Sequence, residues 1–89
     1  MTPLWWLSFA DPDKPEGQRF IGVAVVPCDT DTISRAADTA WKLGCNPGGE
    51  VLGMRLPDDI IERVPLAAIG CLLRGEQVSG LVAVIEGRG

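Results

Sequence analysis

The stretch that decides the fold runs from Trp41 to Glu50 and reads WKLGCNPGGE. It predicts a helix end, a turn and a strand start in quick succession. Gly44 follows a helical pattern and is suited to the left-handed conformation that closes a helix C-terminus. Pro47 and Gly48 suit the central positions of a type II turn, because proline presets φ and glycine accepts a positive φ.

The end of this stretch also has the properties of a binding loop. Gly48 and Gly49 carry no side chains, so the segment from Asn46 to Glu50 can expose backbone N–H groups to an anion or to the edge of a ligand. Glycine-rich turns are common, and the alternative is a tight helix-to-strand connection without a binding role. The sequence alone leaves both interpretations open.

The residues on either side of the stretch predict the elements that it joins. Before Gly44, residues 30–43 predict a helix, and residues 29–32 offer N-cap candidates and negative charge at its start. Its apolar residues recur at helical spacing, and they are Ile33, Ala36, Ala37, Ala40, Trp41 and Leu43. After the turn, residues 50–56 predict a strand, which Pro57 closes.

Two further strands are predicted near the N-terminus. From Leu4 to Ala10 the side chains alternate with the period of two that is typical of a strand. Residues 20–26 are rich in β-branched side chains, which also favour a strand. The loop between them, residues 11–17, contains two prolines and ends on a glycine. The connection is of the hairpin type, so we expect the strands to be antiparallel neighbours.

The pattern is more ambiguous beyond residue 57. Residues 58–63 favour one short helical turn. Residues 66–73 fit either a buried coil or a short strand, because this apolar run contains Gly70. Residues 75–85 have apolar side chains at helical spacing and favour a helix, although part of the run also suits a strand. The last residues, 87–89, are expected to fray.

These elements predict one small domain of the α+β class over residues 1–89. Its sheet is small and antiparallel, in ββαβ order, with one main helix packed across it and a short C-terminal helical segment. We expect the core to lie in residues 4–56, and the sequence defines residues 58–86 less well. A chain of 89 residues buries a modest fraction of its surface, so it gains stability from oligomerisation.

The first two strands are apolar on both faces, which also predicts a homo-oligomer. Trp5, Leu7 and Phe9 lie on one face of the first strand, and Leu4 and Trp6 lie on the other. One helix covers only one face of a sheet. The other face then needs either the C-terminal segment or another subunit.

Composition excludes several classes of function. The formal net charge is −4, with 8 Lys and Arg against 12 Asp and Glu, so no basic face is available for polymeric nucleic acid. No apolar run reaches the roughly 18 residues of a membrane span, so we predict no membrane partner. The N-terminal apolar stretch has no basic residue before it, which argues against a secretory signal and for the cytosol.

The sequence contains no catalytic or metal-binding pattern. It has no histidine, which removes the histidine general base and the Ser-His-Asp and Cys-His arrangements. Cys28, Cys45 and Cys71 are widely spaced and form no CxxC pair, so they predict buried free thiols in a reducing compartment. We therefore predict no enzyme, no cofactor and no metal, with carboxylate-based hydrolysis as an unsupported alternative.

Aromatic and basic residues supply candidates for binding a small anionic nucleotide. Adjacent tryptophans in a strand point to opposite faces, so one is core and the other is free to line an interface or stack on a base, unless both pack against protein. An arginine beside a strand either reaches a phosphate or is a solvated surface residue. The candidate ligand-binding residues are Trp5, Trp6, Arg19, Asn46, Gly48, Gly49, Glu50 and Arg55.

Several of these motifs resemble a family of small uncharacterised phage and prophage proteins. The resemblance lies in WWLSFADPD from Trp5, in FIGV from Phe20 and in WKLGCNPGGEV from Trp41, and it covers residues 4–56. Leu72-Leu73 fits more loosely, and members usually have Ser or Thr near position 74, where this chain has Arg74.

The resemblance implies a phage origin and, by analogy, a role against host defence. Small oligomeric phage proteins of this size include sponges that sequester cyclic oligonucleotide or cyclic ADP-ribose-type immune messengers. We therefore expect an oligomeric nucleotide-binding protein with a pocket near a subunit interface. The alternative is a small accessory protein that acts by protein–protein interaction and holds no small-molecule ligand.

Overall fold

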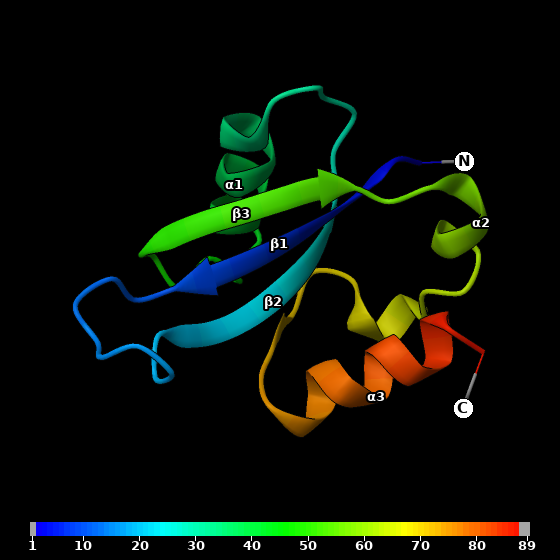
Figure 1. Cartoon of the computed structure of the whole chain (residues 1–89). Coiled ribbons are helices and arrows are strands. Elements are labelled where there is room, and N and C mark those ends of the chain that lie inside the picture. The colour runs from blue at the N-terminus through cyan, green and yellow to red at the C-terminus, as the bar shows by residue number, and fades with distance from the viewer. Residues whose placement is uncertain (1, 88–89) are drawn as a thin grey trace.

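A four-stranded antiparallel sheet organises the chain in the computed structural model, which describes residues 2–87. Of residues 87–89, which were expected to fray, residues 88 and 89 lie outside the described residues, and the N–H of Gly87 donates to the carbonyl of Val84 at 3.1 Å. The strands are β1 (Leu4–Ala10), β2 (Phe20–Pro27), β3 (Glu50–Arg55) and β4 (Leu72–Leu73), in the spatial order β3-β1-β2-β4. The helices are α1 (Ile33–Lys42), α2 (Asp58–Ile61) and α3 (Glu76–Ile85), with a 3-10 turn η1 at Leu66–Ala68 (Figure 1).

The predicted α+β class and antiparallel sheet are confirmed, but the predicted ββαβ order is incomplete. It describes the chain as far as β3, and it omits the short strand β4, which pairs with β2 through Val23↔Leu73 and Ala24↔Leu72. Two residues are too few for a periodic pattern, so the sequence of residues 66–73 could not distinguish this strand from coil.

One face of the sheet, which we call face one, carries Trp5, Leu7 and Phe9 and packs against α1. Ala36 and Ala40 of α1 are fully buried, since their small side chains let the helix approach the sheet closely. Gly53 of β3 lies under this contact, where an added Cβ would be 2.7 Å from Leu7 Cδ2. The buried residues of this core are Trp5, Leu7, Phe9, Ala24, Val26, Ala36, Ala40 and Cys45.

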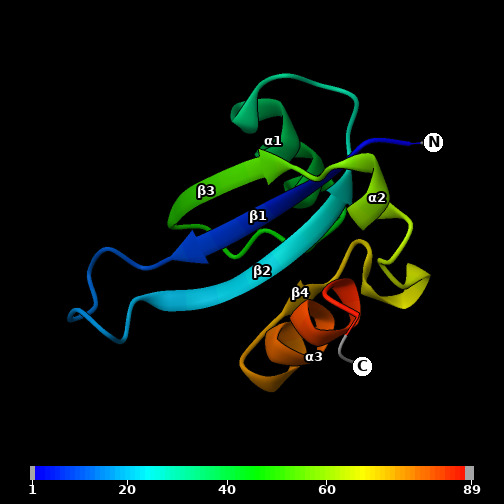
Figure 2. The same cartoon turned by 45° about the vertical axis from the view of Figure 1, so that its right-hand side comes forward.

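The opposite face, face two, is covered by the C-terminal segment. Figures 1 and 2 show α1 and α3 on opposite sides of the sheet. The buried residues here are Leu4, Val25, Val64, Leu73, Leu81 and Ile85, with Trp6 packed against them. The chain itself therefore supplies the cover for most of face two, and this apolar face does not by itself require a second subunit.

A bulge near the end of the first hairpin changes the face of one side chain. The register between β1 and β2 shifts between Phe9, which faces Gly22, and Ala10, which faces Phe20. Ile21 is the extra residue and packs against the face-one core. Strict alternation places Ile21 with Val23 on face two, and that placement is wrong because the two residues of a bulge point to nearly the same side.

The ends of α1 differ from the predicted range 30–43. Thr32 has extended backbone angles and stands at the N-cap, while Gly44 has a φ of 79° and follows Leu43 at the C-cap. The left-handed Gly44 predicted from the sequence is thus confirmed. Trp41, which the helical pattern placed on the apolar side, is 66% exposed because the buried stripe of α1 is narrow and consists of alanines.

The C-terminal elements agree with the helical predictions. A short helix begins at Asp58, and residues 76–85 form α3 as the apolar spacing favours. Within residues 2–87, no helix has the length and apolar character needed to cross a membrane. The expectation of buried thiols holds for Cys45 but is wrong for Cys71, which is exposed, and Cys28 is half-buried.

Candidate functional site

Trp5 is part of the face-one core and is unavailable for stacking on a ligand. Its side chain is 6% exposed, and its indole Nε1–H donates a hydrogen bond of 3.2 Å to the carbonyl oxygen of Thr30. Trp6 points to face two and is half-buried against the second core. The prediction that the two rings lie on opposite faces is confirmed, and both rings pack against protein.

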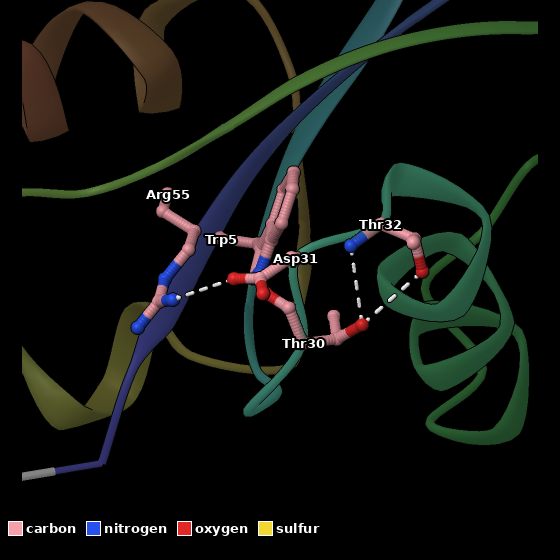
Figure 3. Close-up of polar contacts among 5 residues, drawn as sticks. All are labelled: Trp5, Thr30, Asp31, Thr32 and Arg55. Atoms are coloured by element: carbon pink, nitrogen blue, oxygen red, sulfur yellow. Dashed lines mark hydrogen bonds and ion pairs between the residues drawn. The ribbon is translucent and has the colours of Figure 1, made fainter.

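Arg55 already has a partner in the segment that precedes α1. Its Nη1 lies 3.2 Å from Oδ1 of Asp31, and the two side chains are 45% and 93% exposed. Figure 3 shows this ion pair beside Trp5 and the hydrogen bonds between Thr30 and Thr32. An exposed pair of this kind contributes about 0–1 kcal/mol, so an anion could compete for the guanidinium at little cost.

The loop from Asn46 to Glu50 closes on itself and on β1. The amide Nδ2 of Asn46 donates to the carbonyl of Ala37 at 3.0 Å, and its Oδ1 accepts from the N–H of Gly48 at 2.8 Å. Gly48 and Gly49 have φ values of 86° and 82°. A Cβ on Gly49 would lie 2.3 Å from the carbonyl oxygen of Ala10. The close approach that requires glycine is therefore to the protein's own backbone.

Arg19 belongs to the loop between β1 and β2. Its Nε–H donates to the carbonyl of Lys14 at 2.9 Å, and its own carbonyl accepts from the N–H of Asp11 at 2.7 Å. These two contacts close the long hairpin connection. The side chain is exposed and lies at the end of the sheet where β1 ends.

Strand register divides the candidate residues into two groups. Trp5 pairs with Arg55 at one end of β3, and Ala10 pairs with Glu50 at the other. Glu50 and Arg55 are five residues apart along one strand, about 17 Å at the usual rise. The loop glycines, Asn46 and Arg19 lie with Glu50, so one chain does not bring them together with the tryptophans and Arg55.

Among residues 2–87 there is no cluster of three or more Cys, Asp or Glu that could hold a metal ion. Burial raises the pKa of the Cys45 thiol, which donates to the carbonyl of Ala40 at 3.5 Å. A thiol in that state is a poor nucleophile at neutral pH.

An apolar hollow that the sequence reasoning missed lies between η1 and α3. Its volume is about 310 Å³, and Gln77 supplies the one polar side chain among the described residues of its lining. Gly80 leaves open space there. Apart from its chain neighbours and the nearby backbone of its own helix, no described atom lies within 4 Å of where its Cβ would stand. The lining residues are Pro65, Ala67, Ala68, Leu73, Gln77, Gly80, Leu81 and Val84.

This C-terminal hollow has exposed apolar side chains beside it, and the segment that forms it carries a negative balance of charge. Leu66 is 87% exposed and Val84 is 42% exposed, and both lie on the two elements that form the hollow. Residues 57–87 carry five carboxylates and two arginines. One of these arginines, Arg63, donates from Nη1 to the carbonyl of Ile85 at 2.9 Å. The signal in the sequence was a glycine inside an apolar helix, which predicts missing side-chain volume.

Comparisons with known proteins give no further assignment. No protein-family model matches the chain, and no match was found among curated proteins or solved structures.

Proposed function

We propose that this protein is an interaction module whose C-terminal hollow receives apolar side chains from a basic, amphipathic segment of another protein. The observation that carries the proposal is the apolar, open hollow between η1 and α3. Grooves of this kind bind amphipathic helices through apolar anchors on one helix face. The protein-interaction alternative from the sequence is thus the one that the geometry favours.

The lining of the hollow favours a side chain over a nucleotide. Binding a phosphate or a base edge needs several convergent donors. The one polar side chain in the described lining, Gln77, has its Oε1 engaged by the N–H of Arg74 at 3.1 Å. Apolar walls with exposed Leu66 beside them instead favour an aliphatic or aromatic anchor.

The charge of the C-terminal segment sets the chemistry of the partner. Five carboxylates against two arginines give residues 57–87 a negative balance. Complementary charge speeds association and selects against wrong partners. A partner segment with lysines or arginines flanking its apolar anchors fits this balance, and an acidic one does not. We place this interaction in the cytosol, where the exposed thiol of Cys71 stays reduced.

Fluorescence anisotropy with two matched peptides tests the proposal. Both peptides carry leucines at helical spacing. The polar face of the first peptide carries lysines, and that of the second carries glutamates. We expect the lysine peptide to bind and the glutamate peptide to bind at least about tenfold more weakly.

Variants of α3 localise that binding. Gly80→Leu fills the hollow, so it should abolish binding of the lysine peptide while the fold is retained. Ser79→Leu adds the same side chain one position away, at an exposed residue outside the lining, and should leave binding unchanged. Equal binding to the natural chain and to Gly80→Leu would place the peptide elsewhere and contradict the proposal.

The nucleotide-sequestering function remains a prediction from the resemblance. Its candidate residues lie in two groups at opposite ends of β3, and several already bond to protein atoms. A pocket that combines an aromatic face, the glycine loop and an arginine would need groups from more than one chain.

A further inference from the structure

β3 is an edge strand of the sheet, and its outer edge has no strand paired with it among the described residues. Within the described residues it pairs with β1 alone, at the end of the order β3-β1-β2-β4. The N–H of Leu56 donates to the carbonyl of Leu4. In an antiparallel ladder the hydrogen-bonded pairs recur every second residue, so the N–H and C=O groups of Val51, Gly53 and Arg55 point away from β1.

This edge lacks the features that normally prevent strand pairing. Edge strands are usually protected against pairing with another chain by lysine, proline, a bulge or a covering segment. β3 reads EVLGMR and contains no lysine or proline, and its register with β1 has no shift. Leu52 is 77% exposed and Met54 is 54% exposed, on the part of face two that the C-terminal segment leaves uncovered. Figure 2 shows β3 as the outermost strand on that side of the sheet.

We propose that a second copy of this chain pairs with β3 in antiparallel fashion about a twofold axis at Gly53. When two copies of one strand pair, the side chains of opposed residues lie on the same face of the joined sheet only if their residue numbers differ by an even number. Centring the pair on Gly53 uses all three outward residues, with Val51 opposite Arg55 of the second copy. On face two it places Leu52 opposite Met54 of the second copy, twice by symmetry.

Charge and exposure favour a second copy in this orientation. β3 begins with Glu50 and ends with Arg55. Antiparallel pairing brings the acidic end of one strand beside the basic end of the other, whereas parallel pairing would align like charges. Six residues span about 20 Å, so the contact is smaller than the roughly 800 Å² per partner of a standard interface. We therefore expect a dimer whose population depends on concentration in the micromolar range.

Sedimentation equilibrium of the full chain tests the pairing. The natural protein should approach twice the 9.5 kDa mass of the chain as its concentration rises to hundreds of micromolar. A chain that stays monomeric at every concentration would overturn the proposal and leave this edge to a strand of another protein.

Paired charge substitutions test the register. The double variant Leu52→Lys with Met54→Lys places like charges opposite each other twice, so its dimer dissociation constant should rise at least about tenfold. The double variant Leu52→Lys with Met54→Glu places opposite charges there and should dimerise more tightly than the first. Both substituted side chains are exposed, and thermal melts check that the fold is retained.

One outcome of the charge series contradicts the register. In a pairing centred on Leu52 instead, the introduced lysine faces its own symmetry copy and the glutamate introduced by Met54→Glu faces Glu50. The lysine–glutamate variant would then dimerise more weakly than the double lysine variant, whose second lysine would face Glu50. Leu66→Lys, at an exposed leucine far from β3 in the chain, serves as control and should not change the mass. Loss of the dimer in that control would indicate that the interface lies at the C-terminal hollow and would contradict pairing through β3.

Discussion

Gly48 and Gly49 share a positive φ but have different surroundings. Both have a φ above 80°, which side chains rarely adopt. Beyond its chain neighbours, no described residue has an atom within 4 Å of a Cβ at Gly48, whereas a Cβ at Gly49 would meet the carbonyl of Ala10. The first position therefore requires glycine for its backbone angles alone, and the second also requires it for packing at the end of β1.

Alanine substitutions should separate these two requirements. Gly48→Ala should lower the free energy of unfolding by about 1–2 kcal/mol, the cost of a left-handed residue with a Cβ. Gly49→Ala should cost more, because β3 must also move away from β1. Urea denaturation of both variants measures the difference. Equal losses would mean that the Gly49 contact is relieved without cost.

The three cysteines should differ in reactivity. Cys71 is exposed and Cys45 is buried, and burial raises the pKa of Cys45. The neutral thiol is favoured in the folded state, so its contribution to stability is present at neutral pH and is lost as the pH rises above the unfolded value near 9.

Alkylation by iodoacetamide followed by mass spectrometry measures this order. At neutral pH, Cys71 should be modified first and Cys45 only after unfolding. Cys71→Ser should remove the fast phase. Rapid modification of Cys45 in the folded protein would contradict its burial.

At the scale of elements, α3 carries a glycine in its interior, beside open space. Gly80 lies in the helix interior, where glycine costs about 0.5–1 kcal/mol relative to alanine because of its greater backbone entropy when unfolded. Apart from its chain neighbours and the nearby backbone of α3 itself, nothing among the described residues lies within 4 Å of the Cβ that alanine would add. A glycine at this position leaves the hollow open, at a cost in stability that alanine would avoid.

Gly80→Ala should therefore stabilise the protein. We expect the free energy of unfolding to rise by about 0.5–1 kcal/mol, measured by urea denaturation against the natural chain. A destabilised variant would show that the space beside Gly80 is filled by a neighbouring side chain.

The elements also show which parts of the fold can be predicted from the sequence and which cannot. β1, β2 and α1 were predictable because their patterns are local: alternation, β-branched runs and a helix that ends at Gly44. Strand β4 and the cover over face two depend on contacts between distant residues. The candidate site was chosen by side-chain chemistry. The strand predicted over residues 50–56 already separates Glu50 from Arg55, whereas no local pattern contains the register that places Trp5 opposite Arg55 and Ala10 opposite Glu50.

At the scale of the whole molecule, the chain offers two distinct surfaces. The C-terminal hollow is apolar and lies in an acidic segment, while the open edge of β3 is suited to a second copy. They lie on different elements, so pairing through β3 would leave both hollows accessible. A dimer of this kind would present two hollows to one partner, which strengthens binding if both are engaged at once.

A thermal-shift screen distinguishes this proposal from the nucleotide hypothesis. A messenger present at 100 times its dissociation constant should stabilise the fold by roughly 2.7 kcal/mol, several degrees for a domain of this size. The interaction-module proposal expects no shift with cyclic dinucleotides, cyclic trinucleotides or cyclic ADP-ribose isomers. A clear shift with any of them, in protein shown to be ligand-free, would favour the nucleotide hypothesis.

The most direct measurement of the proposed function is an NMR titration of ¹⁵N-labelled protein with the lysine peptide, in which the amide chemical shifts are recorded at each step. The proposal predicts that the largest changes fall on α3 and η1, around Gly80, Leu81 and Ala68, which line the hollow. The indole signal of Trp5 and the amides of the Asn46–Glu50 loop should stay nearly unchanged. Changes confined to that loop or to β3, or none at all, would contradict binding in the hollow.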